Sequence, residues 1–238
     1  MGDTINANLT AYSSFNEFFI RKLKSKCRPI SSASIVSPVD GTISQMGLIK
    51  HNQLLQAKGR QYTVEDLLSC GSQLAQNFYD GQFITLYLSP RDYHRIHMPI
   101  TATLRNMIYV PGKLFSVQPV TVKYITKLFP RNERLVMLFD SPLGLMAIVM
   151  VGALIVGTMG TTWHGDIRKQ RQSVHYDCAA KTALFKGDEV GYFKLGSTVI
   201  LMFANSNSIT WLPTITVGRQ VNYGNGLVAE RSHILSAI

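Results

Sequence analysis

The sequence predicts a mainly β, α+β fold with a β-sandwich or barrel-like core and a short helical segment at the N-terminus. Most apolar residues fall in short runs rich in Val, Ile and Leu, which are typical of strands. The chain has 238 residues, of which 46% are hydrophobic, enough for the core of one domain with a small appendage. We divide it into an N-terminal amphipathic segment, residues 1–30, and a main domain, residues 31–238.

The N-terminal segment contains one predicted helix, which starts at Phe15. Its apolar face consists of residues three or four apart, namely Phe15, Phe18, Phe19 and Leu23. Ser14 and Glu17 have the spacing of a capping box. Basic residues follow closely: Arg21, Lys22, Lys24, Lys26 and Arg28. Such a helix either packs on the core or lies in a bilayer interface, and the sequence leaves both interpretations open.

After Pro29 the pattern changes to strands. They are expected at residues 35–36, 42–46, 83–88, 104–110, 135–139, 145–151 and 198–203. A short helix is expected at residues 63–68, with Thr63 as its N-cap and Asp66 at its third position. Residues 183–189 fit a strand that enters a turn.

One stretch, residues 143–160, carries no charged side chain and has the length and polarity of a transmembrane helix. Four glycines divide it into short pieces rich in Val and Ile: Gly144, Gly152, Gly157 and Gly160. Because buried strands have this composition, we interpret it as two buried strands rather than a spanning helix.

The charge balance favours an anionic partner. Lys and Arg number 24 against 14 Asp and Glu, a formal net charge of +10. No zinc-finger spacing, ribonucleoprotein signature or helix-turn-helix pattern is present, so an acidic substrate or an anionic membrane is favoured over nucleic acid. Cys27, Cys70 and Cys178 are widely spaced, which favours a reducing compartment over a disulfide framework.

The segment Gly196-Ser197-Thr198 is a candidate for chemistry. In a taut apolar segment, the Ser197 hydroxyl can attack the preceding carbonyl and shift the acyl group from nitrogen to oxygen. Gly196 leaves room for that attack and tolerates the backbone distortion. Elimination of the ester then leaves a pyruvoyl group, an electrophile that no ordinary side chain supplies. By itself the triplet is a weak indication of self-cleavage, because Gly-Ser-Thr is common in turns.

A serine needs a base to take its proton and an acid to orient that base. His97 or His94 and Asp40 are the candidates, although Asp40-Gly41 is also typical of a hairpin turn. On a helix the two histidines, three residues apart, would share a face and could bind a metal, but no third ligand is evident nearby and Pro90 and Pro99 mark this segment as a loop. No metal is expected. Asp92 is close enough in sequence to orient either imidazole, or to pair with a neighbouring arginine.

Several long motifs occur in a fixed order, at residues 15–19, 38–41, 55–59, 87–99, 109–117, 129–134 and 194–198. Together they resemble the phosphatidylserine decarboxylase family, in its bacterial proenzyme type, over residues 12–204. The last residues, from Asn205 on, resemble nothing that we can place.

The resemblance implies self-cleavage between Gly196 and Ser197 into a β chain, residues 1–196, and an α chain, residues 197–238. It implies a triad of Asp40, His97 and Ser197 for that cleavage. Ser197 becomes the pyruvoyl cofactor and the Schiff-base site for the lipid amine, and phosphatidylserine loses carbon dioxide to give phosphatidylethanolamine.

The resemblance also implies a role for His94 in the decarboxylation step, and three more residues are expected to act beside it. His94 is expected to be the acid and base of the decarboxylation, with Asp92 as its orienter. Tyr87 and Ser116 are expected to contact the serine headgroup. Residues 31–238 would then be the catalytic domain and residues 1–30 its membrane-proximal segment.

The expected partners are phosphatidylserine, an anionic membrane surface and the complementary chain of an α/β heterodimer, with further dimerisation left open. We expect peripheral attachment to the cytoplasmic side of the cell membrane. Family members of this type carry a longer N-terminal helical region than the residues before Phe15, so the mode of attachment stays open. Two alternatives remain: a serine hydrolase, which the missing Gly-x-Ser-x-Gly elbow disfavours, and a non-catalytic membrane-binding β domain.

Overall fold

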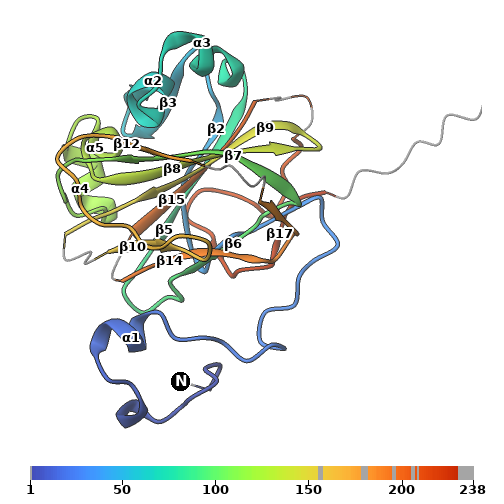
Figure 1. Ribbon diagram of the computed structural model, residues 1–238. Helices are drawn as coiled ribbons and strands as arrows, with labels where there is room; N and C mark the ends of the chain where they lie inside the picture. The colour runs from blue at the N-terminus through green and yellow to red at the C-terminus, as the bar shows by residue number, and fades with distance from the viewer. Residues whose placement is uncertain are drawn as a thin grey trace, which may run out of the picture.

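A computed structural model of the chain describes residues 2–154, 158–177, 182–194, 197–204, 207 and 209–229 (Figure 1). The described part is mainly β, as predicted. Its largest sheet is antiparallel, and its strands run in the order β12-β7-β8-β9-β15-β5-β2-β16, with β13 beside β7. Their bounds are β2 Gly41–Leu48, β5 Gln82–Leu88, β7 Ala102–Val110, β8 Arg134–Ser141, β9 Gly144–Val151, β12 Val174–Tyr176, β13 Ala183–Leu184, β15 Ser197–Phe203 and β16 Gln220–Val221.

A smaller sheet and two strand pairs complete the β structure. The small sheet has the order β11-β10-β14-β6. Its strands are β6 Arg95–His97, β10 Met159–Thr161, β11 Gly165–Asp166 and β14 Glu189–Phe193. The pairs are β1 Ile35–Val36 with β17 Gly226–Val228, and β3 Gln53–Ala57 with β4 Arg60–Thr63.

The large sheet lies between two apolar layers. Figure 1 shows the large sheet between the helices α2 and α3 on one side and the strands β6, β10 and β14 of the small sheet on the other. On β15, Val199 and Leu201 pack in the cluster that includes the small sheet, whereas Ile200 and Met202 pack in the cluster that includes the helices. Because side chains alternate along a strand, burial on both faces requires a continuous apolar run. That requirement explains why β15 and its neighbour β9 carry no charge.

The helices are short: α1 Phe15–Phe19, α2 Val64–Leu68, α3 Ser72–Ala75, α4 Pro119–Tyr124 and α5 Leu128–Arg131, with 3-10 turns at Leu9–Ala11 and Gln76–Phe78. The predicted cap of α2 is confirmed, because the Asp66 N–H donates to Thr63 Oγ1 at 3.1 Å.

The N-terminal helix is shorter than the predicted face to Leu23. Helix α1 ends at Phe19 because the following residues pair with the start of the chain: the Ile5 N–H donates to the Lys22 carbonyl at 3.0 Å, and Leu23 bridges to Thr4.

The uncharged stretch forms buried strands, as predicted, in β9 and β10. Residues 155–157 lie outside the described part. Among the described residues, no helix is long and apolar enough to cross a membrane.

The hairpin interpretation of Asp40-Gly41 is wrong. Strand β1 pairs with β17, and β2 pairs with β5 and β16, so this turn joins two different sheets. The glycine is needed for another reason. A Cβ at Gly41 would lie 2.6 Å from the carbonyl oxygen of Tyr87 on β5.

Candidate active site

Ser197 is the first residue of β15. Its main chain is held in register opposite Leu88 of β5, and its side chain is fully buried. The Oγ atom has no hydrogen-bond partner among the described residues. Burying a hydroxyl without a partner costs about 1–3 kcal/mol, so such an atom is a candidate for chemistry. Gly196, on the other side of the expected cleavage site, lies outside the described residues.

The chain is anchored on both sides of the expected cleavage site, in different sheets. Upstream, the Lys194 N–H donates to the Thr158 carbonyl at 2.9 Å, and its ammonium pairs with Asp166 at 2.6 Å beside the small sheet. Downstream, Ser197 and Thr198 belong to the large sheet. Residues 195–196 therefore connect two fixed points on separate sheets.

His94 is buried behind the N-terminal helix. Its Nδ1 donates to the Asp92 carbonyl at 2.8 Å, and the Phe19 ring lies 4.1 Å from its imidazole, centroid to centroid. This tautomer leaves Nε2 unprotonated, and that atom has no partner among the described residues. Burial lowers the pKa of His94 to about 4, so the ring is neutral near pH 7.

His94 and Ser197 lie on two segments that are tied together at both ends. Leu88 pairs with Ser197 at one end, and at the other the Phe193 N–H donates to the His94 carbonyl at 3.0 Å. His94 Nε2 and Ser197 Oγ, two of the seven buried side-chain polar atoms without a partner among the described residues, therefore belong to one compact region.

His97 lies on β6, opposite Glu189. Its Nδ1 donates to the Gly187 carbonyl at 2.9 Å, so Nε2 accepts from the Tyr93 hydroxyl at 3.0 Å. The Tyr223 ring stacks on it with centroids 3.7 Å apart. Burial lowers the pKa of His97, which keeps this ring neutral as well.

The Asp40 carboxylate is buried beside Tyr223. It accepts the Tyr223 N–H at 2.8 Å and forms an ion pair with Arg28 at 2.7 Å. Tyr223 therefore links Asp40 to His97. The negative charge of Asp40 acts to raise the pKa of both His94 and His97, but burial has the larger effect and lowers both. Among the described residues, no hydrogen bond joins Asp40 to His97 or either of them to Ser197.

Asp92 contacts His94 through its main chain rather than its side chain. The carboxylate instead accepts the N–H and hydroxyl of Ser89, at 2.7 and 2.8 Å. These bonds fix the loop whose carbonyl orients the His94 ring.

Tyr87 and Ser116 line one cavity of about 360 Å³. Phe19, the neighbour of His94, and Leu88, the strand partner of Ser197, line it too. The cavity thus adjoins the region of both buried polar atoms, as a substrate pocket would.

The family model for phosphatidylserine decarboxylase matches residues 15–229, which include all of these side chains. The chain belongs to the phosphatidylserine decarboxylase family. It is therefore a carboxy-lyase of phospholipid metabolism, as the motifs indicated.

Curated relatives of the family agree over most of the chain. The chain is 50% identical over 227 residues to the phosphatidylserine decarboxylase proenzyme of Legionella pneumophila, covering 94% of this chain and 80% of the relative. It is 51% identical over 234 residues to the proenzyme of Delftia acidovorans, covering 97% and 82%. The Nitrosospira multiformis proenzyme is 46% identical over 237 residues, covering 97% and 81%.

Sequence reasoning missed several residues that shape the site. Arg28 was grouped with surface cations, yet it pairs with buried Asp40. Tyr93 stands in the same motif as both histidines, which was an available signal. Phe19 was placed on a helix face without its contact to His94. Tyr223 lies beyond residue 204, where the sequence motifs ended, although the family match extends to residue 229.

Proposed function

We propose that this family member is a proenzyme that cleaves itself between Gly196 and Ser197 and converts Ser197 into a pyruvoyl group. It then uses that group to decarboxylate phosphatidylserine to phosphatidylethanolamine. The observation that carries the proposal is the buried Ser197 Oγ without a described partner, at the start of a strand fixed on both sides. An alanine at position 197 would avoid the cost of burying a hydroxyl without a partner. The presence of a serine is therefore consistent with a precursor of the pyruvoyl group.

In the cleavage step, Ser197 Oγ adds to the Gly196 carbonyl carbon, and the peptide C–N bond breaks to give an ester and a free amine. Neutral His97 takes the hydroxyl proton, which requires its Nε2 to exchange the Tyr93 hydroxyl for Ser197. Asp40 stabilises the positive charge on the ring. The ring passes this proton to the departing Ser197 nitrogen. Elimination then removes the Ser197 Cα proton, breaks the Cβ–O bond and releases the Gly196 carboxylate. The resulting dehydroalanine tautomerises to an imine, which water hydrolyses to the ketone and ammonia.

A pyruvoyl group supplies an electrophilic ketone next to an amide carbonyl, which together delocalise the electron pair left by departing carbon dioxide. His94 acts as the general base and general acid of the decarboxylation. Its unprotonated Nε2 accepts a proton from the substrate ammonium and later returns it to the carbon that lost the carboxylate. The Asp92 carbonyl and the Phe19 ring hold the imidazole for both transfers.

The headgroup is proposed to lie in the 360 Å³ cavity, in contact with Tyr87 and Ser116. Two side chains at its edge, Phe15 and Leu154, are more than 60% exposed, which suits a lipid interface. Arg21 and Lys22 follow α1, and each cation near an anionic surface contributes about 1 kcal/mol. These features support peripheral attachment to an anionic membrane surface. We propose that the α/β heterodimer attaches to the cytoplasmic side of the cell membrane.

The intact mass of the denatured protein tests the proposal. We expect two chains that divide at Gly196/Ser197, with the smaller one lighter by one ammonia than simple hydrolysis gives. Ser197→Ala should stay uncut and release no carbon dioxide from phosphatidylserine, whereas the matched surface change Ser173→Ala should cleave and react normally. A cleaved, active Ser197→Ala protein would refute the mechanism.

A further inference from the structure

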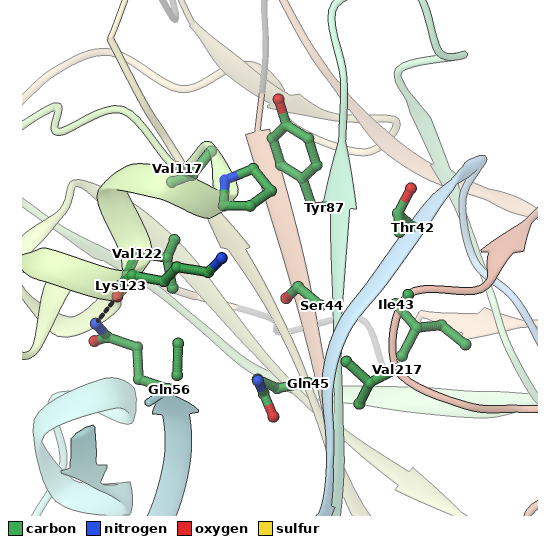
Figure 2. Close-up of a pocket in the computed structure, with 13 residues that line it drawn as sticks. Thr42, Ile43, Ser44, Gln45, Gln56, Tyr87, Val117, Val122, Lys123 and Val217 are labelled. Carbon is green, nitrogen blue, oxygen red and sulfur yellow. Dashed lines mark hydrogen bonds between the residues drawn. The ribbon is translucent and has the colours of Figure 1, made fainter. Parts of the chain in front are cut away.

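A second cavity, of about 250 Å³, lies between β2 and α4 (Figure 2). Figure 2 shows Thr42, Ser44 and Gln45 of β2 on one side. Val122 and Lys123 of α4 lie on the other, beside Gln56. Ala57 and Val217 also line it.

This cavity adjoins the proposed headgroup pocket. Tyr87 and Val117 line both cavities, so these two side chains form the wall between them. A ligand whose polar end lies beside Ser116 would therefore need to pass only Tyr87 and Val117 to reach the second cavity.

Two polar residues of the lining use their hydrogen-bonding atoms within the protein. The Gln56 amide donates to the Val122 and Ile125 carbonyls at 2.8 and 2.7 Å, and its oxygen accepts the Leu128 N–H at 2.8 Å. The Ser44 hydroxyl donates to the Thr85 carbonyl at 3.3 Å. Thr42, Gln45 and Lys123 also line the cavity, but most of its lining surface is apolar, which suits an apolar ligand.

Helix α4, which forms one wall, also presents apolar side chains to solvent. Val120 is 65% exposed and Tyr124 is 66% exposed. The Lys58 ammonium lies 5.4 Å from the Tyr124 ring centroid. Exposed apolar and aromatic side chains beside cations are typical of a surface that contacts an anionic lipid interface. The cavity is thus placed where a lipid tail can enter from a membrane.

We propose that one fatty acyl chain of the lipid substrate occupies the cavity between β2 and α4. The headgroup lies on the Ser197 side of Tyr87, and the chain passes Tyr87 and Val117. This inference rests on the proposed function and adds an apolar subsite to it.

The test fills the cavity from two separate walls. Ala57→Leu enlarges a buried side chain at the end of β3, and Val217→Phe enlarges a half-exposed side chain on the facing loop. We measure kcat/KM for carbon dioxide release from phosphatidylserine with two oleoyl chains and from soluble phosphatidylserine with two hexanoyl chains. For each variant we expect about a tenfold loss with the long-chain substrate, corresponding to roughly 1.4 kcal/mol, and little change with the short one.

The matched control is Ala183→Leu, the same change at an exposed position of β13, which should alter neither value. Complete self-cleavage of each variant shows that it folds. Equal losses for both substrates, or no loss with either variant, would overturn the proposal. If the wild-type protein released no carbon dioxide from either substrate, the proposed function itself would fail, a result distinct from an unchanged ratio between substrates.

Discussion

Arg28→Met removes the cation that neutralises Asp40. The Arg28 guanidinium gives Asp40 hydrogen bonds of 3.1 and 3.2 Å from Nε and 2.7 Å from Nη2. The exposed fraction of the side chain is 17% for Arg28 and 7% for Asp40. Removing one partner of a buried pair leaves a desolvated charge and costs about 3–5 kcal/mol. Because the Tyr223 N–H still binds the carboxylate, we expect a loss near the lower limit, about 3 kcal/mol.

Urea unfolding in the Ser197→Ala background measures this loss in uncut protein. The matched control is Lys127→Met, since Lys127 and Asp66 are also 2.7 Å apart but have exposed fractions of 49% and 37%. That exposed pair should contribute less than about 1 kcal/mol. A similarly small loss for Arg28→Met would refute the reasoning, because it would mean that water screens the Asp40 charge.

The double variant Arg28→Met/Asp40→Asn separates stability from chemistry. With neither charge present, much of the lost free energy of unfolding should return. With Ser197 restored, this double variant should still not cleave, because the introduced amide carries no charge to stabilise protonated His97. Cleavage at the wild-type rate would remove Asp40 from the proposed triad.

Three further predictions concern the histidines. His94→Ala should cleave completely but release carbon dioxide about 10²–10⁴-fold more slowly, and failure to cleave would assign His94 to processing instead. Burial lowers the pKa of His94 from 6.5 to about 4, so the stability from its neutral ring is complete above about pH 6.5 and is lost as pH falls toward 4. Burial lowers the pKa of His97 as well, so both rings act in the same direction. Urea midpoints of the uncut Ser197→Ala protein at about pH 7 and pH 5 should therefore differ less when His94→Phe is added. Tyr93→Phe removes the hydrogen bond to His97 Nε2, so it should lower the free energy of unfolding by about 1–3 kcal/mol. Because Nε2 is then free to accept the Ser197 proton, self-cleavage followed over time should be faster. Slower cleavage would instead make the tyrosine part of the proton path.

Local patterns were enough to predict the strand content and the N-cap of α2. The uncharged stretch became β9 and β10 because glycine spacing and Val/Ile content act over a few residues. The Thr63 cap formed for the same reason. The helix at Phe15 was predicted too long, because its end depends on pairing with residues near the N-terminus.

By itself, the sequence determined the mainly β class, the family and the residues that carry its motifs, because these are written in short continuous segments. Tertiary structure alone decided how those residues are held. Asp40 is bound by Tyr223, 183 residues away, and by Arg28. The second cavity exists because β2, the end of β3 and α4, which are distant in sequence, pack around one space. Such contacts depend on how the layers pack against each other, and no local pattern specifies which distant side chains will meet.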